Sequence, residues 1–141
     1  MISENCIFCD IVSRKQPAYI IYEDSEVMAF MDHAPVELGH VLVIPKDHFE
    51  NIFEIDEERY HQVLRIARFA SIAVKNFTGA DGININQNNG RCANQKVMHY
   101  HVHVIPRFCS RNITWERKSA SSDEMLDLST GIAREMSAVI E

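Results

Sequence analysis

The chain has 141 residues, 46% of them hydrophobic, which predicts one compact domain with a buried core over residues 1–141. Its formal net charge of −6 argues against a nucleic-acid partner, because binding a phosphate backbone needs clustered lysine and arginine. The sequence contains no apolar run of about 18 residues, which a membrane span requires, and residues 1–5 do not resemble a signal peptide. We therefore expect a cytoplasmic protein that binds a small molecule.

Two cysteines near the start of the chain have the spacing of zinc ligands. Cys6 and Cys9 are separated by two residues, so both thiolates can reach one tetrahedral ion. Four cysteines without a secretion signal favour metal binding or free thiols over disulfides. Two ligands are half of a site, so two buried thiols on a short amphipathic turn are the alternative.

Three strands are expected in the first third of the chain. Residues 18–22 and 26–31 are rich in β-branched and aromatic side chains and are joined by three polar residues, which predicts a β-hairpin. Gly39 precedes a third strand over residues 40–44, and Pro45 ends it. His48 lies just beyond this strand and could complete a zinc site with the two cysteines.

A long helix and a fourth strand follow. Asp56 is the expected N-cap of a helix that extends to Phe77 and ends near Gly79. Residues 81–86 alternate strictly between polar and apolar side chains, which predicts a strand with its isoleucines directed inward. The next loop, residues 89–96, carries amides and a cation and can receive an anion. A capping box at residues 121–124 predicts a C-terminal helix.

Residues 97–106 contain three histidines at alternate positions, which predicts a strand. His99, His101 and His103 should share one face, and the residues between them should pack on the core. Neighbouring imidazoles then begin roughly 6–7 Å apart, close enough to share one small substrate or one metal ion. Imidazoles can supply metal ligands, a nucleophile or hydrogen-bond donors to an anion.

With these residues assembled, the chain resembles the short, zinc-carrying branch of the histidine triad family of nucleotide hydrolases and transferases. The specific part is His99-x-His101-x-His103 followed by Pro106-Arg107. The other matching motifs, in chain order, are Cys6-x-x-Cys9, Phe30-x-Asp32-x-x-Pro35, residues 39–46, and Asn88-x-Gly90 ahead of Gln95-x-Val97.

The resemblance implies an α+β fold with a five-stranded antiparallel sheet, a long helix that helps two copies form a homodimer, and a C-terminal helix. It also implies that zinc is held by Cys6, Cys9, His48 and His99. Four protein ligands close the coordination shell, so this zinc would be structural and would not activate water.

The resemblance further implies that His101 is the nucleophile. Its neutral imidazole would attack the α-phosphate of an adenine or other purine nucleotide derivative and form a covalent nucleotidyl-histidine, which water then hydrolyses. The substrate would be a dinucleoside polyphosphate or a nucleoside phosphoramidate. His103, Gln95, Asn88 and the loop backbone would bind the phosphate, Asp32 would bind the ribose, and the base would lie among Ile7, Phe8, Ile11 and Phe30.

Three positions depart from the family pattern. Asn94 stands in place of a glycine, which is mild because asparagine tolerates left-handed backbone angles. Lys96 replaces a small hydroxyl residue beside the leaving group, so its ammonium should favour a polyphosphate over a phosphoramidate. His33 replaces an aliphatic residue of the base pocket, which leaves the base preference open.

Two rival hypotheses remain. The three triad histidines could all bind a catalytic zinc that activates water, although Cys6, Cys9 and His48 argue against this. The chain could also be a non-catalytic module that binds nucleotides and acts through protein contacts.

Overall fold

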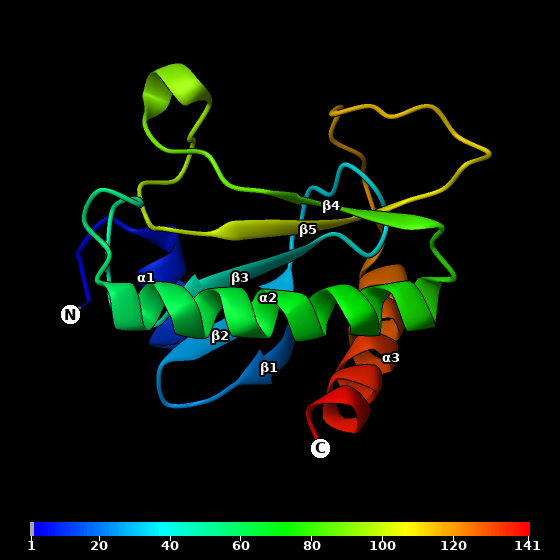
Figure 1. Cartoon of the computed structure of the whole chain (residues 1–141), viewed down its shortest axis with the longest axis horizontal. Helices are drawn as coiled ribbons and strands as arrows, with labels where there is room; N and C mark the ends of the chain where they lie inside the picture. The colour runs from blue at the N-terminus through cyan, green and yellow to red at the C-terminus, as the bar shows by residue number, and fades with distance from the viewer. Residues whose placement is uncertain (1) are drawn as a thin grey trace.

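The computed structural model describes residues 2–141, which form a five-stranded antiparallel sheet with three α-helices (Figure 1). The sheet has the order β1-β2-β3-β5-β4. Its strands are β1 (Ile20–Glu23), β2 (Val27–Met31), β3 (Val41–Pro45), β4 (Gly82–Asn86) and β5 (Val102–Arg107). The helices are α1 (Ile7–Val12), α2 (Glu57–Thr78) and α3 (Ser122–Ile140), with a 3₁₀ turn at Arg91–Ala93. This confirms the expected α+β class and the antiparallel sheet.

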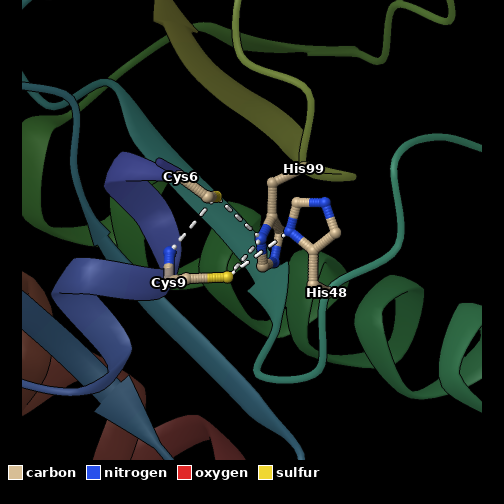
Figure 2. Close-up of side chains that lie close together, drawn as sticks. All are labelled: Cys6, Cys9, His48 and His99. Atoms are coloured by element: carbon tan, nitrogen blue, oxygen red, sulfur yellow. Dashed lines mark hydrogen bonds between the residues drawn. The ribbon is translucent and has the colours of Figure 1, made fainter. Parts of the chain in front are cut away.

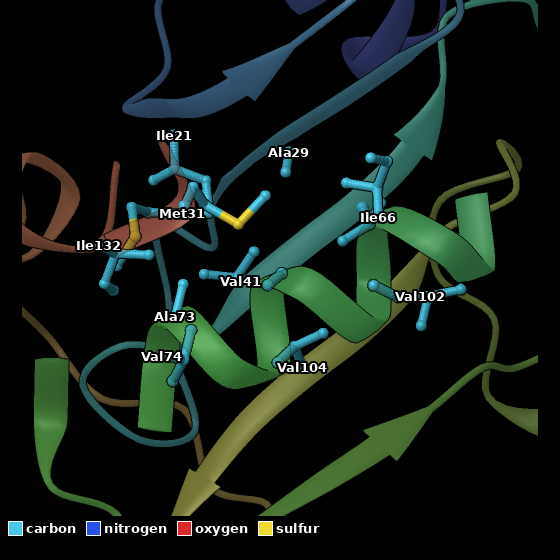
Figure 3. Close-up of a cluster of buried hydrophobic side chains, with 14 of the residues drawn as sticks. Ile21, Ala29, Met31, Val41, Ile66, Ala73, Val74, Val102, Val104 and Ile132 are labelled. Carbon is cyan, nitrogen blue, oxygen red and sulfur yellow. The ribbon is translucent and has the colours of Figure 1, made fainter. Parts of the chain in front are cut away.

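One face of the sheet packs against the two long helices. Side chains of β2, β3 and β5 on this face meet the apolar stripes of α2 and α3 in one buried cluster (Figure 3). The cluster includes Met31, Val41, Val104, Ile66 and Ile132. Because side chains alternate along each strand, burying this face fixes which residues face the other way.

The opposite face carries the polar residues of interest. There α1 covers part of the sheet through Phe8 and Ile11, which pack against Phe30 and Leu42. Leu42 lies opposite Phe30 on one side and opposite His103 on the other, and Asn86 of β4 follows next to His103. The sheet register therefore brings side chains from four strands into one row.

Caps define the ends of both long helices as expected. The Asp56 side chain accepts a hydrogen bond from the backbone of Arg59, and Gly79 adopts left-handed backbone angles after the last turn of α2. Ser121 and Glu124 form a reciprocal capping box before α3. None of the helices in residues 2–141 is long and apolar enough to cross a membrane.

The predicted start of the histidine strand was wrong, and one residue of the fourth strand is more exposed than expected. The regular part of β5 begins at Val102, because Tyr100 donates its backbone hydrogen bond to Phe49 in a loop and not to a strand ladder. The alternation nevertheless holds, since Tyr100, Val102 and Val104 lie in the core. On the edge strand β4, Ile85 lies opposite Val104 and so on the expected face, but it is 55% exposed because α2 covers mainly the inner strands.

The helix pair α2 and α3 yields a stability prediction at Gly131. A Cβ atom there would lie 1.9 Å from Cε1 of Phe77, so glycine permits the close contact with this ring. Gly131→Ala should destabilise the protein by about 1–2 kcal/mol, although alanine favours a helix by about 1 kcal/mol. Chemical denaturation measures this change in the free energy of unfolding.

The matched control uses a Phe77→Ala background. Without the ring, helix propensity alone should act, and Gly131→Ala should then stabilise the protein by about 0.5–1 kcal/mol. Equal effects of Gly131→Ala in both backgrounds would contradict this explanation.

Candidate functional site

Four side chains that could hold a metal ion meet at one end of the sheet (Figure 2). Cys6 and Cys9 come from the start of α1, His48 follows β3, and His99 precedes β5. Their ligand atoms all lie within 4.8 Å of one another. The structure therefore brings together the four residues that the family resemblance implied as zinc ligands.

The distances in this cluster fit a tetrahedral zinc ion. Cys6 Sγ lies 3.4 Å from His99 Nδ1, and Cys9 Sγ lies 3.4 Å from His48 Nδ1 and 3.6 Å from His99 Nδ1. Usual zinc–sulfur and zinc–nitrogen bond lengths at tetrahedral angles place sulfur and nitrogen ligands about 3.5 Å apart. The donor set and its spacing are thus compatible with zinc.

Local backbone structure orients these ligands. Cys6 is the N-cap of α1, and its sulfur accepts a hydrogen bond from the backbone N–H of Cys9. His99 Nε2 lies 2.8 Å from the carbonyl oxygen of Pro45, to which it donates when Nδ1 faces the cluster. Such a bond fixes the ring orientation and the nitrogen that is free for a metal.

His101 is buried and points to the side of the sheet that faces α1. Its Nδ1 lies 2.6 Å from the backbone carbonyl oxygen of His99, which can only accept, so Nδ1 carries the proton. Burial lowers the pKa of His101. The neutral imidazole therefore keeps the lone pair of Nε2 available as a nucleophile or acceptor.

His103 has a different set of partners. The backbone N–H of Val36 donates to Nδ1 of His40 at 3.1 Å, which leaves the proton of neutral His40 on Nε2. His40 Nε2 lies 2.9 Å from His103 Nδ1, so His40 donates and His103 holds its own proton on Nε2. Burial lowers the pKa of His40 to about 4 and that of His103 to about 3. His103 can thus donate a hydrogen bond from Nε2 while remaining neutral.

The triad histidines do not converge on one ion. The Nδ1 atom of His99 faces two thiols, that of His101 faces a carbonyl, and that of His103 faces the imidazole of His40. This arrangement disfavours the rival hypothesis of a catalytic zinc held by all three.

Asp32 lies at the end of β2 and is held as a carboxylate. One oxygen accepts the backbone N–H of Ala34 at 3.0 Å, and the other accepts Arg117 Nη1 at 2.6 Å. Burial opposes ionisation of Asp32, but His40, the Ala34 N–H and Arg117 outweigh it and lower the pKa of the carboxyl. Each oxygen keeps a lone pair for another donor.

A cavity of about 1210 Å³ lies over this face of the sheet. It is lined by nearly all the residues expected from the sequence to bind substrate, together with the expected nucleophile: Ile7, Phe8, Ile11, Phe30, Asp32, Asn88, Lys96, His101 and His103. His33 and His40 also line it. The structure therefore gathers apolar, carboxylate, amide and imidazole groups around one space.

Gln95 is the exception among these expected residues. Its side chain is buried within the loop after β4, where Oε1 accepts from Gly90 and Nε2 donates to the carbonyls of Glu50 and Val97. All these bonds are internal, and Gln95 does not line the cavity. These bonds hold the loop in place, and within it Asn94 has the expected left-handed backbone with φ of 72°.

Among the cavity residues that were not assigned a role from the sequence, two belong to the segment before α3. Trp115 and Arg117 lie on the segment between β5 and α3 and line the cavity. Sequence patterns gave no strand or helix there, but the chain's only tryptophan beside several cations was an available signal.

Comparison with known proteins places this arrangement in a family. A family model of the HIT domain matches residues 13–109, more than half of the chain. The chain is 44% identical over 110 residues to protein hit of Bacillus subtilis, with 75% of this chain and 73% of that protein covered. It is 39% identical over 103 residues to adenosine 5'-monophosphoramidase hnt1 of Schizosaccharomyces pombe, with 73% and 74% covered.

The solved structure of a zinc-bound protein agrees in fold with this chain. The zinc-bound histidine triad family protein of Mycobacterium smegmatis is 33% identical, with a TM-score of 0.84 over 95% of this chain and 97% of that chain. The chain therefore belongs to the histidine triad family, whose HIT domain is generally that of nucleotide-binding hydrolases. The family resemblance inferred from the sequence is confirmed.

The metal cluster leads to a prediction about zinc. Purified protein should contain one zinc ion per chain, and Cys6→Ser should lose it because three ligands hold zinc less tightly than four. If free zinc is present at a thousandfold excess over its Kd, loss of zinc binding lowers the free energy of unfolding by about 4 kcal/mol. Elemental analysis and thermal unfolding measure both effects.

Cys92→Ser is the matched control, since this exposed thiol lies outside the cluster. It should retain zinc and stability. Equal zinc content in Cys6→Ser and the unaltered protein would contradict the assigned ligands.

Proposed function

We propose that the chain is a nucleotide hydrolase or nucleotidyl transferase that cleaves at the α-phosphate of a purine nucleotide derivative through His101. The observation that carries this proposal is the hydrogen bond from His101 Nδ1 to the His99 carbonyl, with Nε2 left unprotonated at the cavity. A neutral imidazole held in this way is a competent nucleophile at neutral pH.

The reaction has two steps. His101 Nε2 attacks the α-phosphorus, and the bond to the leaving group breaks with its electron pair on the departing atom. A water oxygen then attacks the same phosphorus, the N–P bond breaks, and a nucleoside monophosphate leaves with neutral imidazole restored. Hydrolysis of either a dinucleoside polyphosphate or a phosphoramidate can follow these two steps.

The other cavity residues have roles that follow from their chemistry. His103 would donate from Nε2 to a phosphate oxygen, supported by Asn88 and the loop backbone, and so stabilise negative charge in the transition state. Asp32 would accept the ribose hydroxyls. The base would lie against Ile7, Ile11 and the contacting pair Phe8 and Phe30, whose ring centroids are 5.4 Å apart.

Zinc would act as a structural ion. Cys6, Cys9, His48 and His99 would fill all four positions, which leaves none for water. A bound ion would fix His99, whose carbonyl orients His101 two residues later.

We also propose a homodimer in the cytoplasm. The exposed edge side chain Ile85 and the partly exposed Leu64 of α2 are apolar surface that a second copy would cover. The native mass of the protein tests this assembly.

A substitution of His101 tests the enzymatic proposal. His101→Ala should reduce turnover of an adenosine phosphoramidate by roughly 10⁴- to 10⁶-fold, because the attacking atom is removed. Binding of AMP, measured by calorimetry, should be retained.

His61→Ala is the control, because this histidine lies on the exposed surface of α2. Its activity should equal that of the unaltered protein. If the unaltered protein binds AMP but turns over neither substrate, the chain is a non-catalytic nucleotide-binding module.

Lys96 gives a prediction about the leaving group. An ammonium beside the α-phosphate favours a departing phosphate over a departing amine, and one charge pair at the surface contributes about 1 kcal/mol. Lys96→Ser should therefore lower the rate on diadenosine polyphosphate relative to the phosphoramidate by about fivefold. Lys75→Ser, on the exposed surface of α2, should leave the ratio unchanged. Unchanged relative rates in Lys96→Ser would refute this role.

A further inference from the structure

The segment over residues 108–120, called the strap below, lies between β5 and α3 and forms one wall of the cavity. It is the wide yellow-to-orange loop in Figure 1. It has no regular helix or strand. Its position instead depends on ionic and hydrogen-bonded contacts with the turn after β2.

Those contacts hold the strap at several points. Arg117 Nη1 donates to Asp32 and, at 2.8 Å, to the carbonyl of Ala34. Lys118 donates through its backbone to Pro35 and through Nζ to Glu37, each at 2.7 Å. The Glu37 carboxylate is 5% exposed and also pairs with Arg111. A buried carboxylate with two cationic partners fixes the strap against the turn.

The Trp115 ring packs against the side chain of Arg107. Arg107 Nη1 donates to the carbonyl of Thr114 at 3.0 Å, its Nε donates to Asn84, and its guanidinium carbon lies 4.9 Å from the centroid of the Trp115 ring. The cation thus supports the ring, yet Trp115 remains 55% exposed and lines the cavity. An exposed, supported indole at a cavity wall is a surface on which a flat group can stack.

This surface is separate from the apolar wall that would hold the first base. Phe8 and Phe30 come from α1 and β2, whereas Trp115 lies over the far end of β5. Arg107 is four residues beyond His103, about 13 Å along the strand at 3.3 Å per residue. A group bound at Trp115 must therefore be joined to the α-phosphate by a linker of some length.

The cavity has room and charge for such a linker. Its volume of about 1210 Å³ exceeds the roughly 300–1,000 Å³ of common small-molecule sites. Lys96 lines it at the end of the sheet near Cys6 and His48, and Arg117 lines it as the partner of Asp32. Cations that line a cavity can pair with the phosphates of such a linker.

We propose that Trp115 forms a second nucleoside subsite, on which the distal base of a dinucleoside polyphosphate stacks while the proximal nucleotide faces His101. This inference rests on the proposed function and specifies its substrate class. The strap provides the subsite, and the phosphate bridge spans the cavity between His101 and Trp115.

Tryptophan fluorescence tests the subsite directly, because Trp115 is the only tryptophan of the chain. The His101→Ala protein, which should not turn over substrate, is titrated with diadenosine tetraphosphate, adenosine tetraphosphate and AMP. We expect diadenosine tetraphosphate to quench the emission, whereas the two mononucleotides bind with little quenching. Adenosine tetraphosphate is the matched ligand, since it has the phosphates and lacks the second base.

Calorimetry of variants in the same background gives the energetic test. Trp115→Ala should weaken binding of diadenosine tetraphosphate by about 5- to 150-fold, the loss typical of one base–aromatic stack, and leave binding of both mononucleotides unchanged. Trp115→Phe should keep most of the affinity. Ile113→Ala, an exposed strap position outside the cavity lining, should bind like the His101→Ala parent.

Two outcomes would overturn the proposal. If Trp115→Ala weakens the binding of AMP and diadenosine tetraphosphate equally, Trp115 contacts the first nucleoside. If it weakens the binding of neither, Trp115 lines the cavity but contacts no bound nucleotide. If AMP binds normally in these cases, only the subsite fails. If none of the three nucleotides binds the parent protein, the proposed function fails as well.

Discussion

The alternation of side chains along residues 99–107 is the constraint on which the rest of the structure depends. Tyr100, Val102 and Val104 are buried against α2, so the residues between them must face the opposite side of the sheet. A shift of one residue would move the histidines into the apolar core. The free energy of core packing therefore fixes the orientation of His101 and His103 before any substrate is present.

Backbone carbonyls and neutral imidazoles then determine what each histidine can do. The carbonyl of Pro45 accepts a hydrogen bond from His99 Nε2, and the carbonyl of His99 accepts one from His101 Nδ1. His40 Nε2 donates to His103 Nδ1. These bonds leave His101 with an acceptor nitrogen and His103 with a donor nitrogen at the same cavity, although both belong to one strand. Burial lowers both pKa values, so the difference between the two residues comes from tautomers and not from charge.

Sequence patterns predicted the elements whose periodicity is imposed by a core. The spacing of Cys6 and Cys9 indicated half of a metal site, and the family resemblance supplied the full set of four residues that the structure brings together. Sequence patterns failed where tertiary context decides. Ile85 lies opposite Val104 on the expected face, yet it remains exposed because this part of the edge strand has little helix above it. No local signal directs the Gln95 amide to the carbonyl of Glu50, 45 residues away, or places Arg117 beside Asp32, 85 residues away. Such contacts depend on how distant segments meet, which periodicity does not encode.

Detection of the covalent intermediate tests the central claim most directly. The protein is mixed briefly with an adenosine phosphoramidate or diadenosine polyphosphate, denatured, and measured by intact-protein mass spectrometry. We predict an acid-labile mass increase of one adenylyl group, which maps to His101 and is absent from His101→Ala. Turnover without any adduct under rapid quenching, or an adduct that persists in His101→Ala, would contradict nucleophilic catalysis by His101.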